Sequence, residues 1–530
     1  MTFFRQLTIQ RLTTIILFVL LFAMAVRVPT DTDTWWHIRS GEYIVDNTTI
    51  PHTDPFSHTR AGEEWIDHSW GAQVALYGVY ELFGGGREPG APGNIGLALF
   101  TASLATLGML FVFLMCEGNA YTRAFVVVLG AAAAAVFWSP RPQMASFALG
   151  ALILYLLHLY KRRRVDRLWL IPPIIAVWVN IHGGFAIGFI FLLGTLAGEL
   201  IGNILNPTDE NVIHWPRLRK LVWVTALSVL AVALNPYGVQ MVKYPFRTVG
   251  IGVLQDFIQE WGSPDFHQPQ TWPFAVLLLG VLAAAGLSNR RIDWTDLTLV
   301  TGTAMMSLMA GRNIAVFAIA ATPVLSRHVD AWLTDRGWQI RPVRRMSRGM
   351  LRLNWLLLVL VVLGSLIKIV SVVNSTTVRE AQETYLPVEL AAFLDETPPE
   401  GVMFNSYNWG GYLMFAAPEV PVYVDGRTDL YDDAFLRDYL DVVFVRDGWD
   451  QQLDEQGIGF VAVEAESFLA TMLRSRPDRW REQQFDRGRS ALFVRTEDVT
   501  AAANRRCAPA GVPVCWLPAD HGNGVPAVCF

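Results

Sequence analysis

The chain has 530 residues, of which 52% are hydrophobic and only 17% charged, and it carries 19 tryptophans. This composition excludes an ordinary soluble protein, because apolar runs of about 20 residues, long enough to span a bilayer, recur along the chain. The formal net charge of -5 is small and gives no indication of a nucleic-acid partner, so the informative property is how charge is distributed along the chain.

About eleven apolar segments predict membrane-spanning α-helices. They cover residues 12–28, 94–116, 121–138, 143–160, 168–181, 184–205, 219–235, 272–288, 293–310, 312–326 and 353–373. The stretch 68–83 is more amphipathic and predicts a helix that lies at the membrane interface. The first segment could be read as a cleaved signal peptide, but no small-residue cleavage site follows it, so we expect it to stay as an anchor.

Lysine and arginine residues gather at alternate ends of these segments. They precede the first segment, follow the fourth, sixth and eighth, and fill the loop before the last: Arg5, Arg11, Lys161, Arg162, Arg163, Arg164, Arg217, Arg219, Lys220, Arg290, Arg291, Arg327, Arg336, Arg341, Arg344, Arg345, Arg348 and Arg352. If the segments alternate in direction, all of these residues lie on one side, which the positive-inside rule identifies as the cytoplasm. The sequence predicts a multi-pass protein of the cytoplasmic (inner) membrane, with a cytoplasmic N-terminus and the residues after Asn374 outside.

The segment 374–530 is polar and predicts an extracytoplasmic domain. Its runs VELAAFLDE, GVMFNSY, VPVYVDG, IGFVAVEA, SFLATMLRS and SALFVRTE alternate between helical and strand-like patterns, which favours a small α/β domain with a partly parallel sheet. The expected fold is an α-helical polytopic membrane domain over residues 1–373, with a large first outer loop at 29–93, followed by this α/β domain.

Three of the four cysteines lie near the C-terminus, in a compartment that permits disulfides. A bridge between Cys507 and Cys515 would leave Cys529 unpaired. Cys116 is expected to be a buried residue of the membrane domain.

The most concentrated polar motif follows the first apolar segment. Asp31 and Asp33 stand beside Trp35, Trp36 and His37, at a membrane exit where charged groups are costly unless they meet a partner, a metal or substrate. Two acids at this spacing suit a divalent cation such as Mg²⁺ or Mn²⁺, or a general base, and they equally suit capping of the next helix. The tryptophans are either interfacial anchors or platforms for a sugar, and the histidine is either a substrate contact or an ordinary interface residue.

Other unusual polar motifs also fall at the predicted outer ends of segments. They are His68 in the first outer loop, Arg141 in SPRPQ, Asn180 and His182 in VNIHGG, Asn235 and Tyr237 in NPYG, Glu260 in FIQEWGSP, Arg312 and Asn313 in AGRN, and Trp409, Asp425 and Arg427 in the outer domain. This convergence predicts a polar cavity open to the outside. His182, between a helix end and two glycines, is more typical of helix-end packing than of a ligand contact.

Arg312 lies between two apolar runs, where an arginine is costly without an anion. Its planar fork of donors suits phosphate, and an ion pair with Asp31 or Glu260 is the structural alternative. Arg141 is a weaker candidate for the same role. Glu260 is a candidate catalytic acid, although a loop acid is more often only a solvated residue.

The first outer loop resembles the GT-C superfamily of polytopic glycosyltransferases, which use polyprenyl-phosphate-linked sugars. The resemblance rests on D-x-D-x-W-W-H-I-x-x-G, I-P-x-x-D-P-F-S and W-x-x-H-S-W, and on the Asn-x-His-Gly-Gly, Asn-Pro-Tyr-Gly and Gly-Arg-Asn segments. This set of motifs is similar to that of a bacterial branch of predicted membrane proteins in the superfamily. In the outer domain, NSYNWGGYL followed by VYVDGRTDLY is similar in layout to the W-W-D-Y-G region of the oligosaccharyltransferase catalytic subunit, with Asn408 in place of the acid. Asp425, Gly426 and Arg427 could equally form a turn with an internal ion pair.

The resemblance implies transfer of a sugar from a polyprenyl-phosphate-linked donor to a glycan, lipid or protein acceptor at the outer membrane face. An acid of the first outer loop, Asp31 or Asp33, would act as base or hold a metal, and Arg312 or a cation would stabilise the leaving phosphate. No second Asp-x-Asp stands in another membrane loop, so transfer without a metal stays open. A transporter of lipid-linked glycans and a non-catalytic scaffold are the alternatives.

Overall fold

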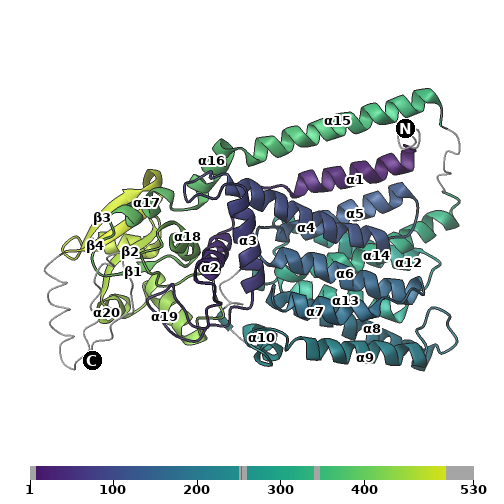
Figure 1. Ribbon diagram of the computed structural model, residues 1–530, viewed down its shortest axis with the longest axis horizontal. Helices are drawn as coiled ribbons and strands as arrows, with labels where there is room; N and C mark the ends of the chain where they lie inside the picture. The colour runs from purple at the N-terminus through teal and green to yellow at the C-terminus, as the bar shows by residue number, and fades with distance from the viewer. Residues whose placement is uncertain (1–6, 250–251, 254–258, 339–345, 497–530) are drawn as a thin grey trace.

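The computed structural model describes residues 7–249, 252–253, 259–338 and 346–496. A bundle of long helices forms one end of the elongated molecule, and a smaller α/β domain forms the other (Figure 1). The three cysteines near the C-terminus, and with them the predicted disulfide, lie outside the described residues. Cys116 is described, and it is buried as predicted.

Every predicted apolar segment forms a helix of the bundle. These helices are α1 (Ile9–Ala25), α4 (Gly93–Met115), α5 (Ala120–Ala134), α6 (Gln143–Arg162), α7 (Ile171–Trp178), α8 (Ala186–Leu205), α9 (Trp215–Ala231), α12 (Trp272–Leu287), α13 (Trp294–Met309), α14 (Ile314–Asp335) and α15 (Arg348–Val373). Short 3₁₀ turns extend several of them, namely η2 (Ala135–Phe137), η3 (Leu168–Leu170), η4 (Gly183–Phe185), η6 (Pro269–Thr271) and η7 (Gly311–Asn313).

Seven helices of the described chain are long and apolar enough to cross a membrane: α4, α5, α6, α8, α12, α14 and α15, with their 3₁₀ extensions. The other four predicted spans fall short. For example, α1 has 17 residues, which is about 26 Å at 1.5 Å per residue and less than a hydrocarbon core of about 30 Å. The chain is a polytopic membrane protein, and the shorter helices pack within the same bundle.

Small residues let the helices approach closely. A Cβ atom on Gly130 of α5 would lie 2.1 Å from Thr322 Oγ1 of α14, and one on Gly198 of α8 would lie 2.4 Å from the Thr295 Cα of α13. Such contacts at small residues are a main source of packing between membrane helices, since lipid provides no hydrophobic drive for helix association.

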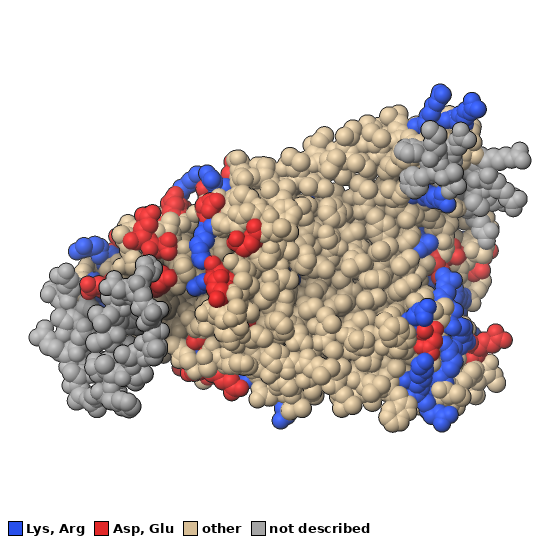
Figure 2. Space-filling model, viewed as in Figure 1, with Lys and Arg blue, Asp and Glu red and all other residues tan. Residues whose placement is uncertain are grey.

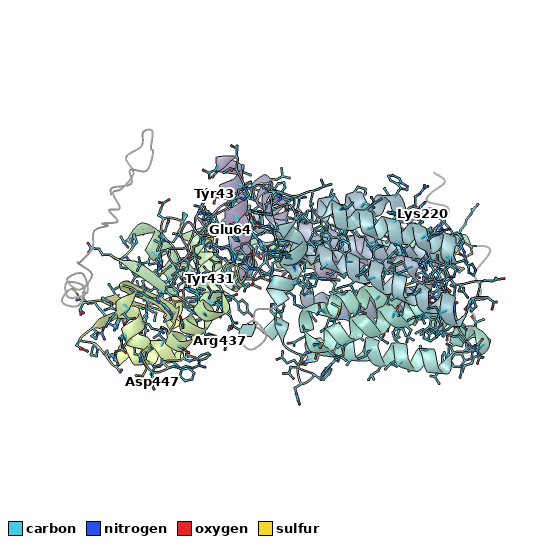
Figure 3. All side chains as sticks on the ribbon, turned by 90° about the horizontal axis from the view of Figure 1, so that it is seen from below. Tyr43, Glu64, Lys220, Tyr431, Arg437 and Asp447 are labelled. Carbon is cyan, nitrogen blue, oxygen red and sulfur yellow. The ribbon has the colours of Figure 1, made fainter. Side chains whose placement is uncertain are left out.

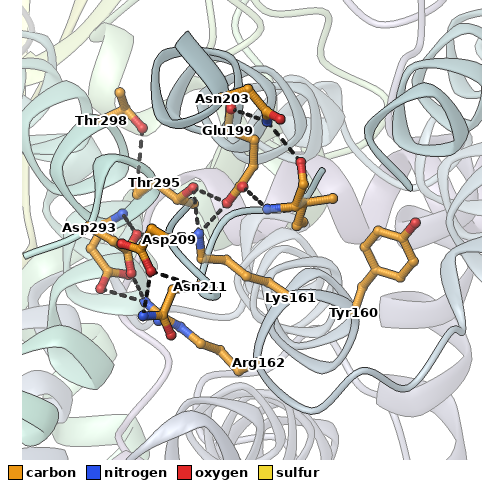
Figure 4. Close-up of polar contacts among 12 residues, drawn as sticks. Tyr160, Lys161, Arg162, Glu199, Asn203, Asp209, Asn211, Asp293, Thr295 and Thr298 are labelled. Atoms are coloured by element: carbon orange, nitrogen blue, oxygen red, sulfur yellow. Dashed lines mark hydrogen bonds and ion pairs between the residues drawn. The ribbon is translucent and has the colours of Figure 1, made fainter. Parts of the chain in front are cut away.

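Charge is segregated along the bundle (Figure 2). Lysine and arginine gather at the end farthest from the α/β domain, and the broad middle shows almost no charged side chains. At this basic end, acids compensate basic side chains between helices: Lys161 and Arg162 of α6 pair with Glu199 of α8 and with Asp293, which caps α13 (Figure 4). Arg162 also pairs with Asp296 in the first turn of α13. The pairs satisfy charges that would otherwise be costly to bury.

Three shorter helices lie where the bundle meets the C-terminal domain: α2 (Asp33–Asn47), α3 (Trp70–Leu82) and α10 (Gln240–Val249). Helix α3 is the helix predicted at the interface, and it crosses the end of the bundle together with α2 (Figure 1). The first loop (residues 29–93) is therefore folded over the end of the bundle and is not an open connection.

Residues 346–496 of the C-terminal part form four strands, β1 (Val402–Asn405), β2 (Ile458–Glu464), β3 (Trp480–Phe485) and β4 (Ser490–Arg495), in the order β1-β2-β4-β3. Strands β1 and β2 are parallel and the other pairs are antiparallel, which confirms the predicted α/β class with a partly parallel sheet. The helices of the C-terminal domain are α16 (Ser375–Tyr385), α17 (Val388–Glu396), α18 (Tyr407–Ala416), α19 (Asp433–Val443), α20 (Trp449–Glu455) and α21 (Phe468–Arg474).

The strand-like run 420–426 forms no strand of this sheet. Its backbone bonds to the first loop instead: His58 N–H donates to the Val422 carbonyl at 3.0 Å, and Val422 N–H donates to the Phe56 carbonyl at 3.3 Å. The apolar core is also shared, because Trp35 of α2 and Trp65 of the first loop belong to the same buried cluster as the residues of the sheet.

Candidate active site

A cavity of about 1400 Å³ lies between the end of the bundle and the C-terminal domain. Both parts of the chain contribute to its wall. The lining residues with titratable or amide side chains include Asp33, His37, His68, Arg141, His182, Tyr244, Glu260, Arg312, Asn313, Tyr407, Asn408 and Asp429. Nine of the seventeen sequence-predicted site residues, Trp36 among them, thus line one cavity, together with several additional residues.

The start of α2 separates the roles of the two acids in the Asp-x-Asp motif. The Asp31 Oδ1 atom accepts a hydrogen bond of 3.0 Å from the Asp33 backbone N–H, while Thr32 gives no side-chain cap. Asp31 therefore performs the capping role expected at a helix start. Asp33 is free to direct its carboxylate into the cavity, which Asp31 does not line.

Arg141 stands at the centre of three carboxylates. Its guanidinium lies 2.9 Å from Asp33 Oδ2, 3.6 Å from Asp31 Oδ2 and 3.6 Å from Glu260 Oε2. Burial alone would lower the pKa of Arg141, but Asp33, Asp31 and Glu260 together raise it. Arg141 therefore remains a fixed positive charge in the cavity wall.

Asp33 has an altered proton affinity. Burial raises the pKa of Asp33 to about 7, against the opposing effect of Arg141 and with a further contribution from Asp31 and Glu260. A carboxylate with a pKa near the working pH is suited to general base catalysis.

Arg312 is the second arginine of the cavity. It lies 3.9 Å from Glu260 Oε1 and stacks on the indole of Trp261 at 4.1 Å. The bond from Gly311 N–H to the Gly262 carbonyl, 2.9 Å long, joins the two loops that carry these side chains. The two arginines of the cavity wall present hydrogen-bond donors of the kind that suits an anion such as phosphate.

A histidine pair completes the wall. The His68 Nδ1 atom lies 2.7 Å from the Tyr244 hydroxyl and 3.8 Å from Asp429 Oδ2, and its ring centroid lies 5.9 Å from that of His182. Burial lowers the pKa of His68, against the opposing effect of Asp429, which favours a neutral imidazole. His182 also bonds Ser146 Oγ at 2.8 Å and accepts from Gly184 N–H, so it performs the predicted helix-end packing while lining the cavity.

Three residues predicted to bind substrate stabilise the connections around the cavity and do not line it. The Asn180 amide joins Trp70 Nε1 to the Leu234 carbonyl. Asn235 bonds within its own turn, to Tyr237 N–H and the Val232 carbonyl. The Tyr237 hydroxyl accepts from Asp67 N–H at 2.9 Å. The polar groups of these three side chains therefore form hydrogen bonds within the protein and do not face the cavity.

Four more predicted residues lie outside the cavity because they are packed into the shared core. Trp35 packs against Tyr412 and Phe415, and Trp409 is buried in α18. Arg427 and Asp425 are fully buried and pair with each other at 2.7 Å. Of the NSYNWGGYL run, which is similar in layout to the W-W-D-Y-G region, Tyr407 and Asn408 line the cavity and Trp409 does not.

Comparison with solved structures identifies the architecture. The archaeal oligosaccharyltransferase AglB from Archaeoglobus fulgidus, in complex with an inhibitory peptide and a dolichol-phosphate, aligns over 92% of this chain and 74% of its own, with 12% identity and a TM-score of 0.54. The chain shares the fold of this archaeal oligosaccharyltransferase. The apo crystal structure of the A. fulgidus oligosaccharyltransferase aligns over 86% of this chain and 70% of its own, with 11% identity and a TM-score of 0.51.

The crystal structure of ArnT from Cupriavidus metallidurans bound to undecaprenyl phosphate aligns over 92% of this chain and 98% of its own, with 12% identity and a TM-score of 0.49. No protein-family model matches the sequence, and no curated protein matches it.

The residues of this cavity do not fit a divalent cation. Asp31 and Asp33, predicted as tentative ligands, both face Arg141, whose guanidinium already provides positive charge between them. Within the described ranges, no group of three or more His, Cys, Asp or Glu side chains is arranged to hold a metal ion.

Sequence reasoning did not single out Tyr244 and Tyr407 as site residues. Tyr244 lies on α10, an amphipathic helix in the same loop as Glu260, and amphipathic character in a predicted outer loop was the available signal. Tyr407 directly precedes Asn408 in the NSYNWGGYL run, but nothing in the sequence alone distinguishes it from Trp409.

Proposed function

We propose that this protein is a membrane glycosyltransferase that moves a sugar from a polyprenyl-phosphate-linked donor to an acceptor on the outer face of the cytoplasmic membrane. The observation that supports this most strongly is that Asp33 and Arg312 line one cavity at the end of the bundle. The basic residues gather at the opposite end (Figure 2), which by the positive-inside rule would be cytoplasmic.

The cavity wall provides suitable surroundings for such a donor. Its part between the helices is apolar, with Phe147, Ile187, Ile190, Val316 and Ile319, and would hold isoprenoid units. Arg141 and Arg312 would then receive the phosphate. The A. fulgidus enzyme of the same fold was solved with a dolichol-phosphate, which supports a lipid phosphate as a ligand of this protein.

In the proposed reaction, ionised Asp33 takes the proton from the acceptor's nucleophilic group. That group attacks the anomeric carbon of the sugar and forms the new glycosidic bond. The bond between the anomeric carbon and the phosphate oxygen breaks, and its electron pair leaves with the lipid phosphate. Arg312 donates hydrogen bonds to the charge that develops there, and Arg141 keeps Asp33 oriented.

The acceptor would approach along the wall that the C-terminal domain contributes, where Tyr407, Asn408 and Asp429 line the cavity. We therefore propose that residues 1–373 bind the lipid-linked donor and that residues 374–530 contribute to binding a glycan, lipid or protein acceptor.

The test is transfer by purified protein in lipid nanodiscs, supplied with a panel of polyprenyl-phosphate sugars and with glycan, lipid and peptide acceptors. Wild type is compared with Asp33→Asn and with Asp46→Asn, which makes the same change at an exposed position of α2. We expect a glycosylated product with wild type and Asp46→Asn, and none with Asp33→Asn. Equal transfer by all three would refute the role of Asp33, and sugar movement across liposomes without bond formation would favour a transporter.

A further inference from the structure

One turn of the C-terminal domain, residues 425–429, contacts the first loop at three points. Gly426 meets Asp33, Arg427 pairs with Asp54, and Asp429 lies beside His68. The three partners are spread over 36 positions of the first loop, yet one short turn contacts them all. We call this segment the 425–429 turn.

The contact with Asp33 depends on the absence of a side chain at Gly426. A Cβ atom there would lie 2.0 Å from Asp33 Oδ1, 3.0 Å from its Cγ and 3.1 Å from Trp36 Nε1. Because real Cβ atoms essentially never come within 3.0 Å of another heavy atom, any larger residue would force the carboxylate or the turn to move. Gly426 lets the turn lie directly against the carboxylate.

Helix α18 also approaches closely, both to the residue before the turn and to the residue before α2. A Cβ atom on Gly410 of α18 would lie 2.0 Å from the Val424 carbonyl oxygen, and one on Gly411 would lie 2.9 Å from the Thr32 carbonyl oxygen. Helix α18 therefore packs closely against both the approach to the turn and the start of α2, with Trp36 beside it.

A fully paired ion network fixes the turn. Arg427 is completely buried, with Nε and Nη2 donating to Asp425 at 2.9 and 2.7 Å and Nη1 donating to Asp54 at 2.5 Å. The Tyr431 hydroxyl donates to the same Asp425 carboxylate at 3.0 Å, at the junction seen in Figure 3. The guanidinium also lies 4.8 Å from the ring centroid of Trp65. A buried network with every group satisfied holds one geometry, since each alternative leaves a charge unpaired.

We propose that the 425–429 turn holds the Asp33 carboxylate in place and covers it on the side of Oδ1, with Gly426 as a positioning residue for the transfer reaction. The proposal rests on the role of Asp33 in the proposed function. It implies that the C-terminal domain is part of the base's environment, in addition to any contact with the acceptor.

The experiment uses the full chain in nanodiscs and follows the infrared band of the protonated Asp33 carboxyl with pH, assigned by its loss in Asp33→Asn. Gly426→Ala is compared with Gly78→Ala of α3, where a Cβ atom would meet nothing within 4 Å. We expect Gly78→Ala to keep the wild-type midpoint. Gly426→Ala should lower the midpoint by about one pH unit or more, because a displaced, hydrated carboxylate is more acidic.

Transfer kinetics provide the second readout. Gly426→Ala should lower kcat about tenfold or more and leave the KM for the lipid donor unchanged, since Arg312 is untouched. An unchanged midpoint in folded Gly426→Ala would overturn the proposal. If that variant does not assemble, Arg427→Lys keeps the charge but loses the fork that fixes the turn, and a wild-type midpoint in it would equally overturn the proposal.

A failure of the proposed function and a failure of the positioning role would give different results. If Asp33→Asn transfers sugar normally while Gly426→Ala still shifts the infrared midpoint, the proposed function fails and the positioning role stands. If Asp33→Asn is inactive and the midpoint of Gly426→Ala is unchanged, only the positioning role fails.

Discussion

The Asp33 carboxylate lies 2.9 Å from the guanidinium of Arg141, yet burial raises the pKa of Asp33 to about 7. A single cation at that distance normally lowers a carboxylate's pKa. Here Arg141 is shared with Asp31 and Glu260, and these two acids raise the pKa of Asp33 in addition to its partial burial. The result is a carboxylate that gains and loses its proton near neutral pH.

Transfer activity should therefore have an acidic limb near pH 7. The reaction uses ionised Asp33, so the rate should rise with pH through the pKa of about 7 and level off above it. Arg141→Gln removes a charge that lowers this pKa, and its limb should move to higher pH. Initial rates between about pH 5 and about pH 9 measure both, and a wild-type limb near the ordinary aspartate value of about 4 would contradict the assignment.

The same group should make stability depend on pH. The folded pKa of about 7 exceeds the unfolded value of about 4, so between these values the folded chain keeps a proton that the unfolded chain has lost. Stability from this group is complete below about pH 4 and is lost as pH rises through about 7. Asp33→Asn should therefore show a shallower fall in Tm over that window, while Asp46→Asn follows wild type. Parallel curves for all three proteins would count against the raised pKa.

Arg312→Lys should weaken donor binding. Lysine keeps the charge but loses the planar fork and the stacking on Trp261. A charge-assisted hydrogen bond contributes about 1.5–3 kcal/mol, so the Kd for polyprenyl phosphate should rise roughly 10- to 100-fold. Tryptophan fluorescence titration in nanodiscs measures this. Arg437→Lys, half-exposed on α19, is the matched control, and equal affinities in the two variants would argue against phosphate binding at Arg312.

Lys161→Met should destabilise the protein without affecting the site. Lys161 pairs with Glu199 inside the basic end of the bundle (Figure 4), and breaking a buried pair costs about 3–5 kcal/mol because it leaves the other charge unpaired. Lys220→Met is the control, since Lys220 lies half-exposed at the same end of the molecule (Figure 3) and an exposed pair contributes about 1 kcal/mol or less. Thermal unfolding should separate the two variants clearly, and similar Tm values would show that the buried pair is not stabilising.

The helices of the fold could be predicted from sequence because apolar runs determine where a membrane protein is helical. The extent of each membrane crossing could not, since α1 and α7 are apolar but short and depend on neighbouring helices. In the C-terminal domain the run 420–426 had a strand-like pattern, but its partners are in the first loop, and a single-strand pattern cannot indicate a partner so distant in sequence.

The candidate site was partly predictable for a similar reason. Four charged residues at the ends of predicted membrane segments were candidates because a charge there is costly without a partner. These residues share one cavity: Asp33, Arg141, Glu260 and Arg312. Asn180, Asn235 and Arg427 gave the same signal but are paired within the protein, and only tertiary contacts reveal this. The sequence indicated a turn with an internal ion pair at Gly426, and Arg427 does pair with Asp425. It gave no indication of a contact with Asp33, because the contribution of Gly426 is the space that it leaves for that side chain.

The most direct test of the central claim is single-turnover transfer from a radiolabelled polyprenyl-phosphate sugar, prebound to wild type and to Asp33→Asn at about pH 8, above the pKa of about 7. If Asp33 is the general base, Asp33→Asn should bind the donor at least as tightly as wild type and transfer the sugar roughly 100-fold more slowly or worse. Transfer by Asp33→Asn at the wild-type rate would contradict the account.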